Sequence, residues 1–203
     1  METKIEFNSD DTIVLEGLLH IGTTGHGVVI THPHPLYGGD MYNNVVETIQ
    51  NVYQENGYTT LRFNFRGCGQ STGQYDDGNG EQADLAAAFN YLRADGASSV
   101  DLAGYSFGTW IIAKALDNDK ITADAVIMVS PPAAMMQFEP TAPIPNLKLV
   151  VTGSQDEFAP PDLVEKLAAD TWNPDAAFEI IKGADHFFFG YTNELIKIIQ
   201  NSV

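Results

Sequence analysis

The serine at position 106 lies in a pattern that can make its hydroxyl a nucleophile. Ser106 is the centre of Gly104-Tyr-Ser-Phe-Gly108, which follows the apolar run Val100–Ala103 and precedes a helical pattern over Thr109–Leu116. At a joint between a strand and a helix, G-x-S-x-G forms a sharp, strained turn that exposes the serine oxygen. The flanking glycines lack Cβ atoms and let the strand and the helix close together. The pattern predicts covalent catalysis by this serine.

A serine hydroxyl needs a base, and the base needs a carboxylate that orients it; behind such a turn the chain order is serine, acid, histidine. His186 is the only histidine after Ser106 and follows the last predicted strand, so we expect it to be the base. Asp156 follows a buried strand in a Gly-x-x-Asp turn and is the expected acid. Glu157 is the alternative. Asp185 is a weaker one, since it adjoins the histidine and neighbouring side chains usually point apart.

Attack on a carbonyl group also requires backbone N–H donors that stabilise the oxyanion. One donor is the residue after the nucleophile, Phe107, and the other comes from the loop after the third strand, here His32–Gly39. By position we expect the His34 N–H to be the second donor, with Leu36 as the alternative. His32 and His34 could instead bind a metal ion, but no third ligand cluster is close in the sequence. A buried, hydrogen-bonding His32 that shapes the loop explains the pattern better.

Two further groups of residues have a possible chemical interpretation. Arg66-Gly-Cys-Gly-Gln-Ser71 resembles a phosphate-binding loop but lacks the Gly-Lys-Ser/Thr ending. Cys68 does not lie in a strand-to-helix turn of the kind around Ser106, and no motif places a base beside it, so we expect it to be structural. The apolar clusters Phe187-Phe-Phe189 and Met135-Met136 either line an acyl pocket or belong to the core, and the sequence does not decide between these.

The composition limits the classes of function. The chain has 203 residues, of which 44% are hydrophobic and 18% charged, so we expect one soluble domain over residues 1–203. Its net charge of −17 argues against partners such as nucleic acid or an anionic membrane. We find no apolar run of about 18 residues, no signal-peptide pattern at the first residues and a single cysteine, Cys68. These features predict a cytoplasmic protein and leave its oligomeric state open.

Strands and helices must position these residues, and the hydrophobic patterns place them in alternation. After a hairpin of Lys4–Phe7 and Thr12–His20, strands are predicted at Gly27–Thr31, Tyr58–Phe65, Val100–Ala103, Ala125–Val129, Leu147–Thr152 and Phe178–Ile181, and helices at Tyr42–Asn56, Glu81–Ala94, Thr109–Leu116, Asp162–Thr171 and Tyr191–Gln200. This alternation indicates an α/β protein with a mostly parallel sheet and helices on both faces. The longest stretch without an element, Ser130–Asn146, is too short for a helical lid domain.

Several motifs in a fixed order make the chain resemble the α/β-hydrolase superfamily over nearly its whole length. It is most similar to the small, capless, dienelactone-hydrolase-like bacterial branch. The stretches that carry the resemblance are His32–Gly39, Asn43–Val46, Leu61–Gly67, Asp76–Glu81, Gly104–Gly108, Gly153–Asp156 and Asp185-His186. The resemblance implies an eight-stranded sheet, no large cap domain and a Ser106–His186–Asp156 triad. Dienelactone hydrolases themselves use a cysteine nucleophile, so the serine at position 106 argues against a dienelactone substrate. The resemblance does not fix the substrate.

These observations favour a serine hydrolase that cleaves a small carboxylic ester or thioester through an acyl-enzyme on Ser106. Neither a metal nor an organic cofactor is required. An acyl-peptide hydrolase or an acyltransferase would use the same triad and is the first alternative. A non-catalytic binding protein is the second, because a fold does not by itself imply a function.

Overall fold

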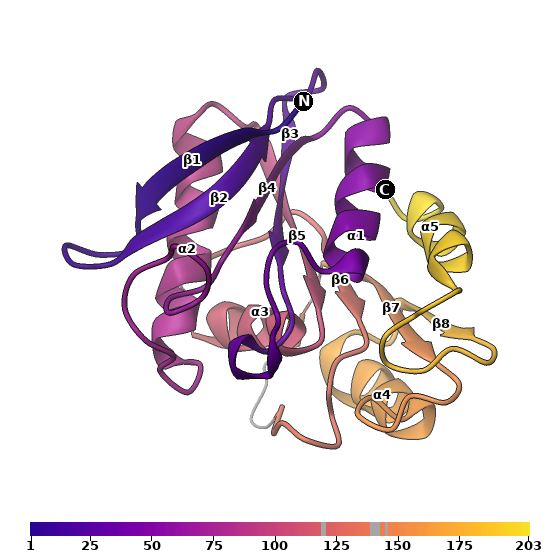
Figure 1. The fold of residues 1–203 in the computed structure, drawn as a ribbon. Helices are drawn as coiled ribbons and strands as arrows, with labels where there is room; N and C mark the ends of the chain where they lie inside the picture. Colours follow the sequence, from indigo (N-terminus) through magenta and orange to yellow (C-terminus); the bar gives the residue numbers. More distant parts are fainter. Residues whose placement is uncertain (119–120, 139–142, 145) are drawn as a thin grey trace.

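A twisted, mixed sheet carries the elements that position the site. The computed structural model describes residues 1–118, 121–138, 143–144 and 146–203. Within these residues the sheet has eight strands in the order β1-β2-β4-β3-β5-β6-β7-β8 (Figure 1). The pairs β1–β2 and β2–β4 are antiparallel, and all other neighbours are parallel. The eight-stranded, mostly parallel sheet that the sequence predicts is thus confirmed.

The strands and helices lie close to their predicted positions. The strands are β1 (Thr3–Asn8), β2 (Val14–His20), β3 (His26–Thr31), β4 (Thr59–Phe63), β5 (Ser99–Tyr105), β6 (Val126–Val129), β7 (Leu147–Gly153) and β8 (Ala177–Ile181). The α-helices are α1 (Asn44–Glu55), α2 (Asn79–Ala94), α3 (Phe107–Asp117), α4 (Pro161–Leu167) and α5 (Thr192–Gln200), and a 3₁₀ turn covers Pro35–Tyr37. Helix α3 begins two residues earlier than predicted, directly after Ser106.

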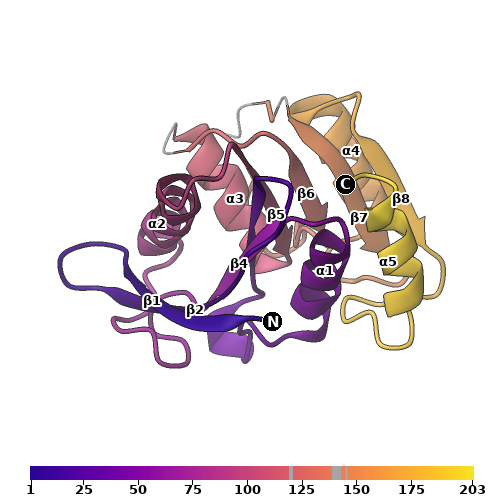
Figure 2. The same cartoon turned by 90° about the horizontal axis from the view of Figure 1, so that it is seen from above.

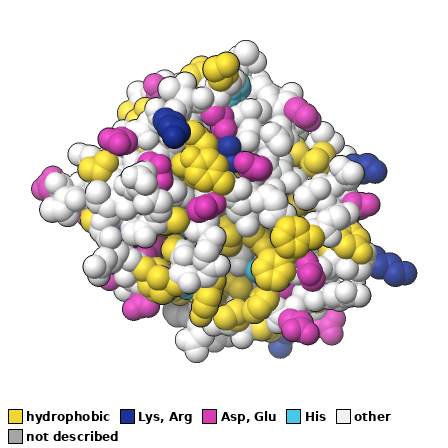
Figure 3. All heavy atoms as spheres, in the orientation of Figure 1, with side chains coloured by type: hydrophobic (Ala, Val, Ile, Leu, Met, Phe, Trp, Pro, Cys, Tyr) yellow, Lys and Arg dark blue, Asp and Glu magenta, His cyan; other side chains and the backbone are white. Residues whose placement is uncertain are grey.

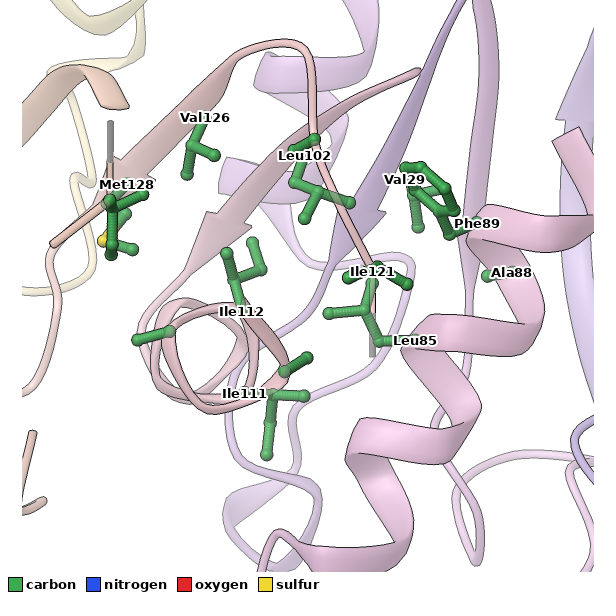
Figure 4. Packing of buried hydrophobic residues seen from close by; sticks show 14 of the residues in the cluster. Val29, Leu85, Ala88, Phe89, Leu102, Ile111, Ile112, Ile121, Val126 and Met128 are labelled. Carbon is green, nitrogen blue, oxygen red and sulfur yellow. The ribbon is translucent and has the colours of Figure 1, made fainter. Parts of the chain in front are cut away.

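Helices cover both faces of the sheet, as predicted. Helices α1 and α5 lie on one face, and α2, α3 and α4 lie on the other (Figure 2). Each face has its own buried apolar cluster. Figure 4 shows part of the larger cluster, in which side chains of α2 and α3 pack against the strands, among them Leu85, Phe89, Ile111, Ile112, Val29 and Leu102. The central strands are buried on both faces, which explains their continuous apolar sequences.

The prediction of one α-helix over Asp162–Thr171 is wrong in its second half. The α-helix ends at Leu167, and a π-helical turn covers Ala168–Trp172. Val164, Ala168 and Trp172 are all buried against the core. The Asn173 N–H donates to the Ala168 carbonyl, five residues earlier, at 2.9 Å, which is the hydrogen bond of a π turn.

The stretch between β6 and β7 carries no helix or strand in its described residues, 130–138, 143–144 and 146. Residues 139–142 and 145 of the predicted loop lie outside the described part of the chain. In the described ranges, therefore, no large cap domain covers the carboxyl ends of the strands. No helix in these ranges is both long and apolar enough to cross a bilayer.

Candidate active site

The turn around Ser106 has the strained geometry that its sequence predicts. Strand β5 ends at Tyr105 and helix α3 starts at Phe107, so the serine occupies the joint alone. Its φ of 54° and ψ of −123° lie in a region that residues other than glycine rarely adopt. The Ser106 N–H donates to the Val129 carbonyl of β6 at 2.9 Å. The neighbouring strand therefore holds the backbone of the turn in place.

The two glycines of the turn are required by a third element, strand β3. A Cβ atom on Gly104 would lie 2.7 Å from Thr31 Oγ1, and one on Gly108 would lie 2.5 Å from the same atom. Cβ atoms essentially never approach a neighbour within 3.0 Å. The glycines thus let β5 and α3 close on β3, which is the role predicted for them.

Three side chains form a hydrogen-bonded relay that ends at the Ser106 hydroxyl. His186 Nε2 lies 2.8 Å from Ser106 Oγ, and His186 Nδ1 lies 2.9 Å from Asp156 Oδ2. An ionised carboxylate can only accept, so the Nδ1 atom carries the proton and Nε2 accepts from the serine hydroxyl. All three residues are buried. This arrangement allows the imidazole to take the proton of the hydroxyl.

The alternative acids do not contact the histidine. Asp185 is exposed, and its Oδ1 accepts from the Phe187 N–H at 3.0 Å. Glu157 is also exposed. Asp156 is therefore the carboxylate that the structure brings to His186.

Sequence reasoning missed a second partner of this carboxylate, Ser130. Its hydroxyl donates to Asp156 Oδ2 at 2.7 Å, while Asp156 Oδ1 accepts from the N–H groups of Phe158 and Ala159 at 3.0 and 2.8 Å. Burial raises the pKa of Asp156, but its hydrogen bonds and the charge of His186 outweigh burial and hold the pKa below its usual value. The carboxylate is therefore ionised and fixed. Ser130 directly follows β6 and has a φ of 47°. No local sequence motif predicts this conformation or its contact with Asp156.

The backbone of His186 is held by Tyr105, the residue directly before Ser106. The Tyr105 hydroxyl donates to the His186 carbonyl at 2.7 Å, and the two rings lie 5.4 Å apart. Burial, with the nearby charges of Asp156 and Asp185, raises the pKa of Tyr105. The phenol thus stays protonated and keeps its donor. Phe158 packs edge-on against the other side of the imidazole at 4.9 Å.

The two residues expected to supply the oxyanion donors, Phe107 and His34, both line the pocket that holds Ser106. Phe107 is the first residue of α3, and the His34 ring packs on its ring at 4.7 Å. The Leu36 N–H donates to His34 Nδ1 at 3.2 Å and is therefore engaged within its own loop. Ser106, Phe107 and His34 line one pocket, and Leu36 is exposed. This placement favours His34 over Leu36 as the second donor.

His32 fixes the loop that carries His34. The His32 Nδ1 atom lies 2.6 Å from the Pro33 carbonyl, and Nε2 accepts from the Phe65 N–H at 3.0 Å. Burial lowers the pKa of His32 to about 4, so the ring is neutral. Both nitrogens are used, which excludes this ring as a metal ligand in this conformation. The interpretation of His32 as a buried residue that shapes the loop is confirmed.

Cys68 lies in a different environment from Ser106. Its thiol donates to the Gly39 carbonyl at 3.2 Å. Burial, together with the charges of Asp40 and Glu16, raises the pKa of Cys68 to about 11. The thiol is therefore protonated and unreactive at neutral pH, which agrees with the structural role predicted for it.

The pocket in front of Ser106 has a volume of about 590 Å³ and is mostly apolar. Hydrophobic side chains gather around histidine atoms in the lower half of the face shown in Figure 3. Of the two apolar clusters, Met135, Met136 and Phe187 line the pocket. Phe188 is fully buried in the core and Phe189 faces solvent. The clusters are therefore divided between the pocket, the core and the surface.

Comparisons with known proteins agree with this architecture. The family model of the alpha/beta hydrolase fold matches residues 28–149, which is more than half of the chain. An uncharacterised protein of Rickettsia prowazekii is 37% identical over 182 residues, which cover 85% of this chain and 76% of that protein.

Two solved structures superpose on the whole chain. An alpha-beta serine hydrolase homologue from Coxiella burnetii has a TM-score of 0.88 and 33% identity, with 100% of this chain and 97% of that chain covered. A protein of Xanthomonas campestris, described as an a/b serine hydrolase without a lid, has a TM-score of 0.89 and 27% identity, with 100% and 93% covered. Together with the family model, these likenesses show that the chain belongs to the α/β-hydrolase family.

Proposed function

We propose that the protein is a serine hydrolase that cleaves small carboxylic esters or thioesters through an acyl-enzyme on Ser106. The observation that carries this proposal is the relay from Ser106 Oγ to His186 and Asp156, with hydrogen bonds of 2.8 and 2.9 Å at the wall of an apolar pocket. Two relatives support it: the protein from Coxiella burnetii is described as a serine hydrolase homologue, and the one from Xanthomonas campestris as a serine hydrolase without a lid.

In the acylation step, Ser106 Oγ attacks the carbonyl carbon and its proton passes to His186 Nε2. The resulting imidazolium is stabilised by Asp156, which stays ionised because its hydrogen bonds lower its pKa. The tetrahedral intermediate then collapses. Its leaving oxygen or sulfur takes the Nε2 proton, and the acyl group remains on the serine as an ester.

In the deacylation step, His186 removes a proton from water, and the hydroxide attacks the acyl-enzyme carbonyl. Collapse of the second intermediate returns the proton to Ser106 Oγ and releases the carboxylic acid. We assign the two N–H donors for both oxyanions to Phe107 and His34. A single donor of this kind is worth about 2.7–4 kcal/mol of transition-state stabilisation. Every proton in this cycle is held by the chain or by water, so the proposal needs no metal or organic cofactor.

Hydrolysis of p-nitrophenyl esters of rising acyl length tests this function. The wild type should turn over the shorter esters, and Ser106→Ala should lose the activity while remaining folded by circular dichroism. The chain length at which kcat/KM falls would measure the acyl space in the pocket. A folded wild type that hydrolyses none of the esters, or a Ser106→Ala variant as active as the wild type, would refute the proposal.

A further inference from the structure

Two phenylalanines beside the base face solvent. Phe187 is 47% exposed and Phe189 is 72% exposed, whereas Phe188 between them is fully buried. The rings of Phe187 and Phe189 are stacked, with centroids 6.1 Å apart and 20° between their planes. They form one continuous apolar surface, which we name the aromatic ledge.

The backbone of this segment is held in a shape that turns both rings outward. Phe188 has a φ of 56°, in a region that bulky residues rarely adopt, and its ring is buried 6.4 Å from the ring of Tyr105. The Phe187 N–H donates to Asp185 Oδ1 at 3.0 Å, and the Phe187 carbonyl accepts from Asn44 Nδ2 at 3.2 Å. Strained residues that their surroundings hold in place concentrate at functional sites.

The aromatic ledge begins at the wall of the pocket that holds the base. Phe187 lines the pocket together with Ser106, and its ring lies edge-on to the imidazole of His186 at 5.7 Å. Phe158 extends the same wall, with its ring 6.5 Å from that of Phe187. In the acylation step the base must protonate the departing atom, which therefore lies on the His186 side of the nucleophile. The ledge therefore adjoins the side of the pocket on which the base would meet the departing atom.

We propose that the aromatic ledge is the subsite for the leaving group and that it takes an uncharged aromatic or apolar alcohol or thiol. This assignment rests on the serine hydrolase function proposed above. The described residues that line the pocket include no Asp, Glu, Lys or Arg. Asp185 adjoins the ledge, and the chain carries a net charge of −17. The lack of a cationic side chain among the described lining residues and the negative charge around the ledge both disfavour an anionic leaving group, such as a phosphorylated thiol.

A leaving-group subsite has a kinetic signature that an acyl subsite lacks. The leaving group has gone once the acyl-enzyme has formed, so the ledge should act on acylation alone. The test uses two esters with one acyl group, benzyl butanoate and 2-methoxyethyl butanoate. Deacylation of the shared butanoyl-enzyme is measured from the steady state that follows the burst with p-nitrophenyl butanoate.

The variants are Phe187→Ala, Phe189→Ala and the double variant, with Tyr42→Ala as the control. Tyr42 is an aromatic residue of the same 47% exposure as Phe187, and it does not line the pocket. Loss of one aromatic contact should lower kcat/KM for the benzyl ester by about threefold to tenfold. The methoxyethyl ester and the Tyr42→Ala control should stay within about twofold of the wild type. The deacylation rate should not change.

Three results would overturn the assignment alone, with the serine hydrolase function intact. These are an equal loss for both esters, a changed deacylation rate, and variants that lose only self-association, which would make the ledge an interface between copies. A wild type that hydrolyses neither ester and does not react with a fluorophosphonate probe would overturn the hydrolase function, and the ledge subsite with it.

Discussion

Ser106 and Cys68 each lie in a turn between glycines, and only the turn around Ser106 brings a base to the side chain. Ser106 follows β5, and Cys68 follows β4 in Gly67-Cys-Gly69. The serine hydroxyl meets an imidazole nitrogen at 2.8 Å in an open pocket, whereas the thiol donates to the carbonyl of Gly39. The comparison shows that flanking glycines permit a tight turn, and that a base within hydrogen-bond reach decides its function.

Each turn is also supported by a buried aspartate, and the partners of the two carboxylates differ. Asp156 accepts from His186, whose ring can gain and lose a proton. Asp84 accepts from the guanidinium of Arg66 at 2.7 Å and from its backbone N–H at 3.0 Å. An arginine keeps its protons at any accessible pH. The first network can therefore move a proton, and the second can only hold a shape.

Replacing each buried aspartate by asparagine should separate the role of the Asp156 network in catalysis from the role of the Asp84 network in stability. Asp156→Asn should lower kcat by about 10⁴-fold, because an amide no longer fixes the histidine tautomer or stabilises the imidazolium. Steady-state hydrolysis of p-nitrophenyl butanoate measures this effect. An activity close to that of the wild type would remove the acid from the proposed triad.

Asp84→Asn should have the opposite outcome. It leaves the buried guanidinium of Arg66 without its carboxylate, and breaking a buried pair in this way costs about 3–5 kcal/mol of unfolding free energy. Urea titration would show this loss. In the fraction that remains folded, kcat should stay close to the wild-type value, and a large drop would mean that the loop after β4 takes part in the chemistry.

Titration of the buried His32 should make the free energy of unfolding depend on pH. Burial lowers the folded-state pKa of His32 to about 4, below the value of about 6.5 of an unfolded histidine. Its contribution to stability is therefore complete above about pH 6.5 and is lost as the pH falls toward about 4, by roughly 3 kcal/mol in all. His32→Gln should flatten the slope of unfolding free energy against pH in this window, and an unchanged slope would contradict the buried neutral ring.

Ser130→Ala tests a positioning residue in the hydrogen-bond network around Asp156, the proposed catalytic acid. The loss of one charge-assisted hydrogen bond, worth about 1.5–3 kcal/mol, should lower kcat by about tenfold or more and leave KM unchanged. Because Ser130 helps to keep the pKa of Asp156 low, the acid limb of the rate profile should also move to higher pH. A variant that is less stable but has the wild-type kcat and profile would show a purely structural role.

Cys68→Ser should have the smallest effect. The hydroxyl can still donate to the Gly39 carbonyl, so activity and stability should stay within about twofold and about 0.5 kcal/mol of the wild type. A large loss of turnover would give the thiol a function that its raised pKa does not predict.

The sequence predicted the parts of the site that depend on short motifs and chain order. The G-x-S-x-G pattern around Ser106 is local, and His186 is the single histidine after it, so both could be proposed for the site without a structure. The bonds of Ser130 to Asp156 and of Tyr105 to the His186 carbonyl join residues 26 and 81 positions apart, which no local pattern reveals. The division of Phe187, Phe188 and Phe189 between pocket, core and surface depends on one positive φ angle, at Phe188.

The central claim is that Ser106 is the nucleophile, and covalent capture tests it most directly. The wild type would be treated with a fluorophosphonate probe and mapped by peptide mass spectrometry, beside Ser106→Ala and Cys68→Ser. We predict one adduct, on Ser106, in the wild type and in Cys68→Ser, and none in Ser106→Ala. A folded wild type without an adduct, or an adduct on another residue that persists in Ser106→Ala, would contradict the account.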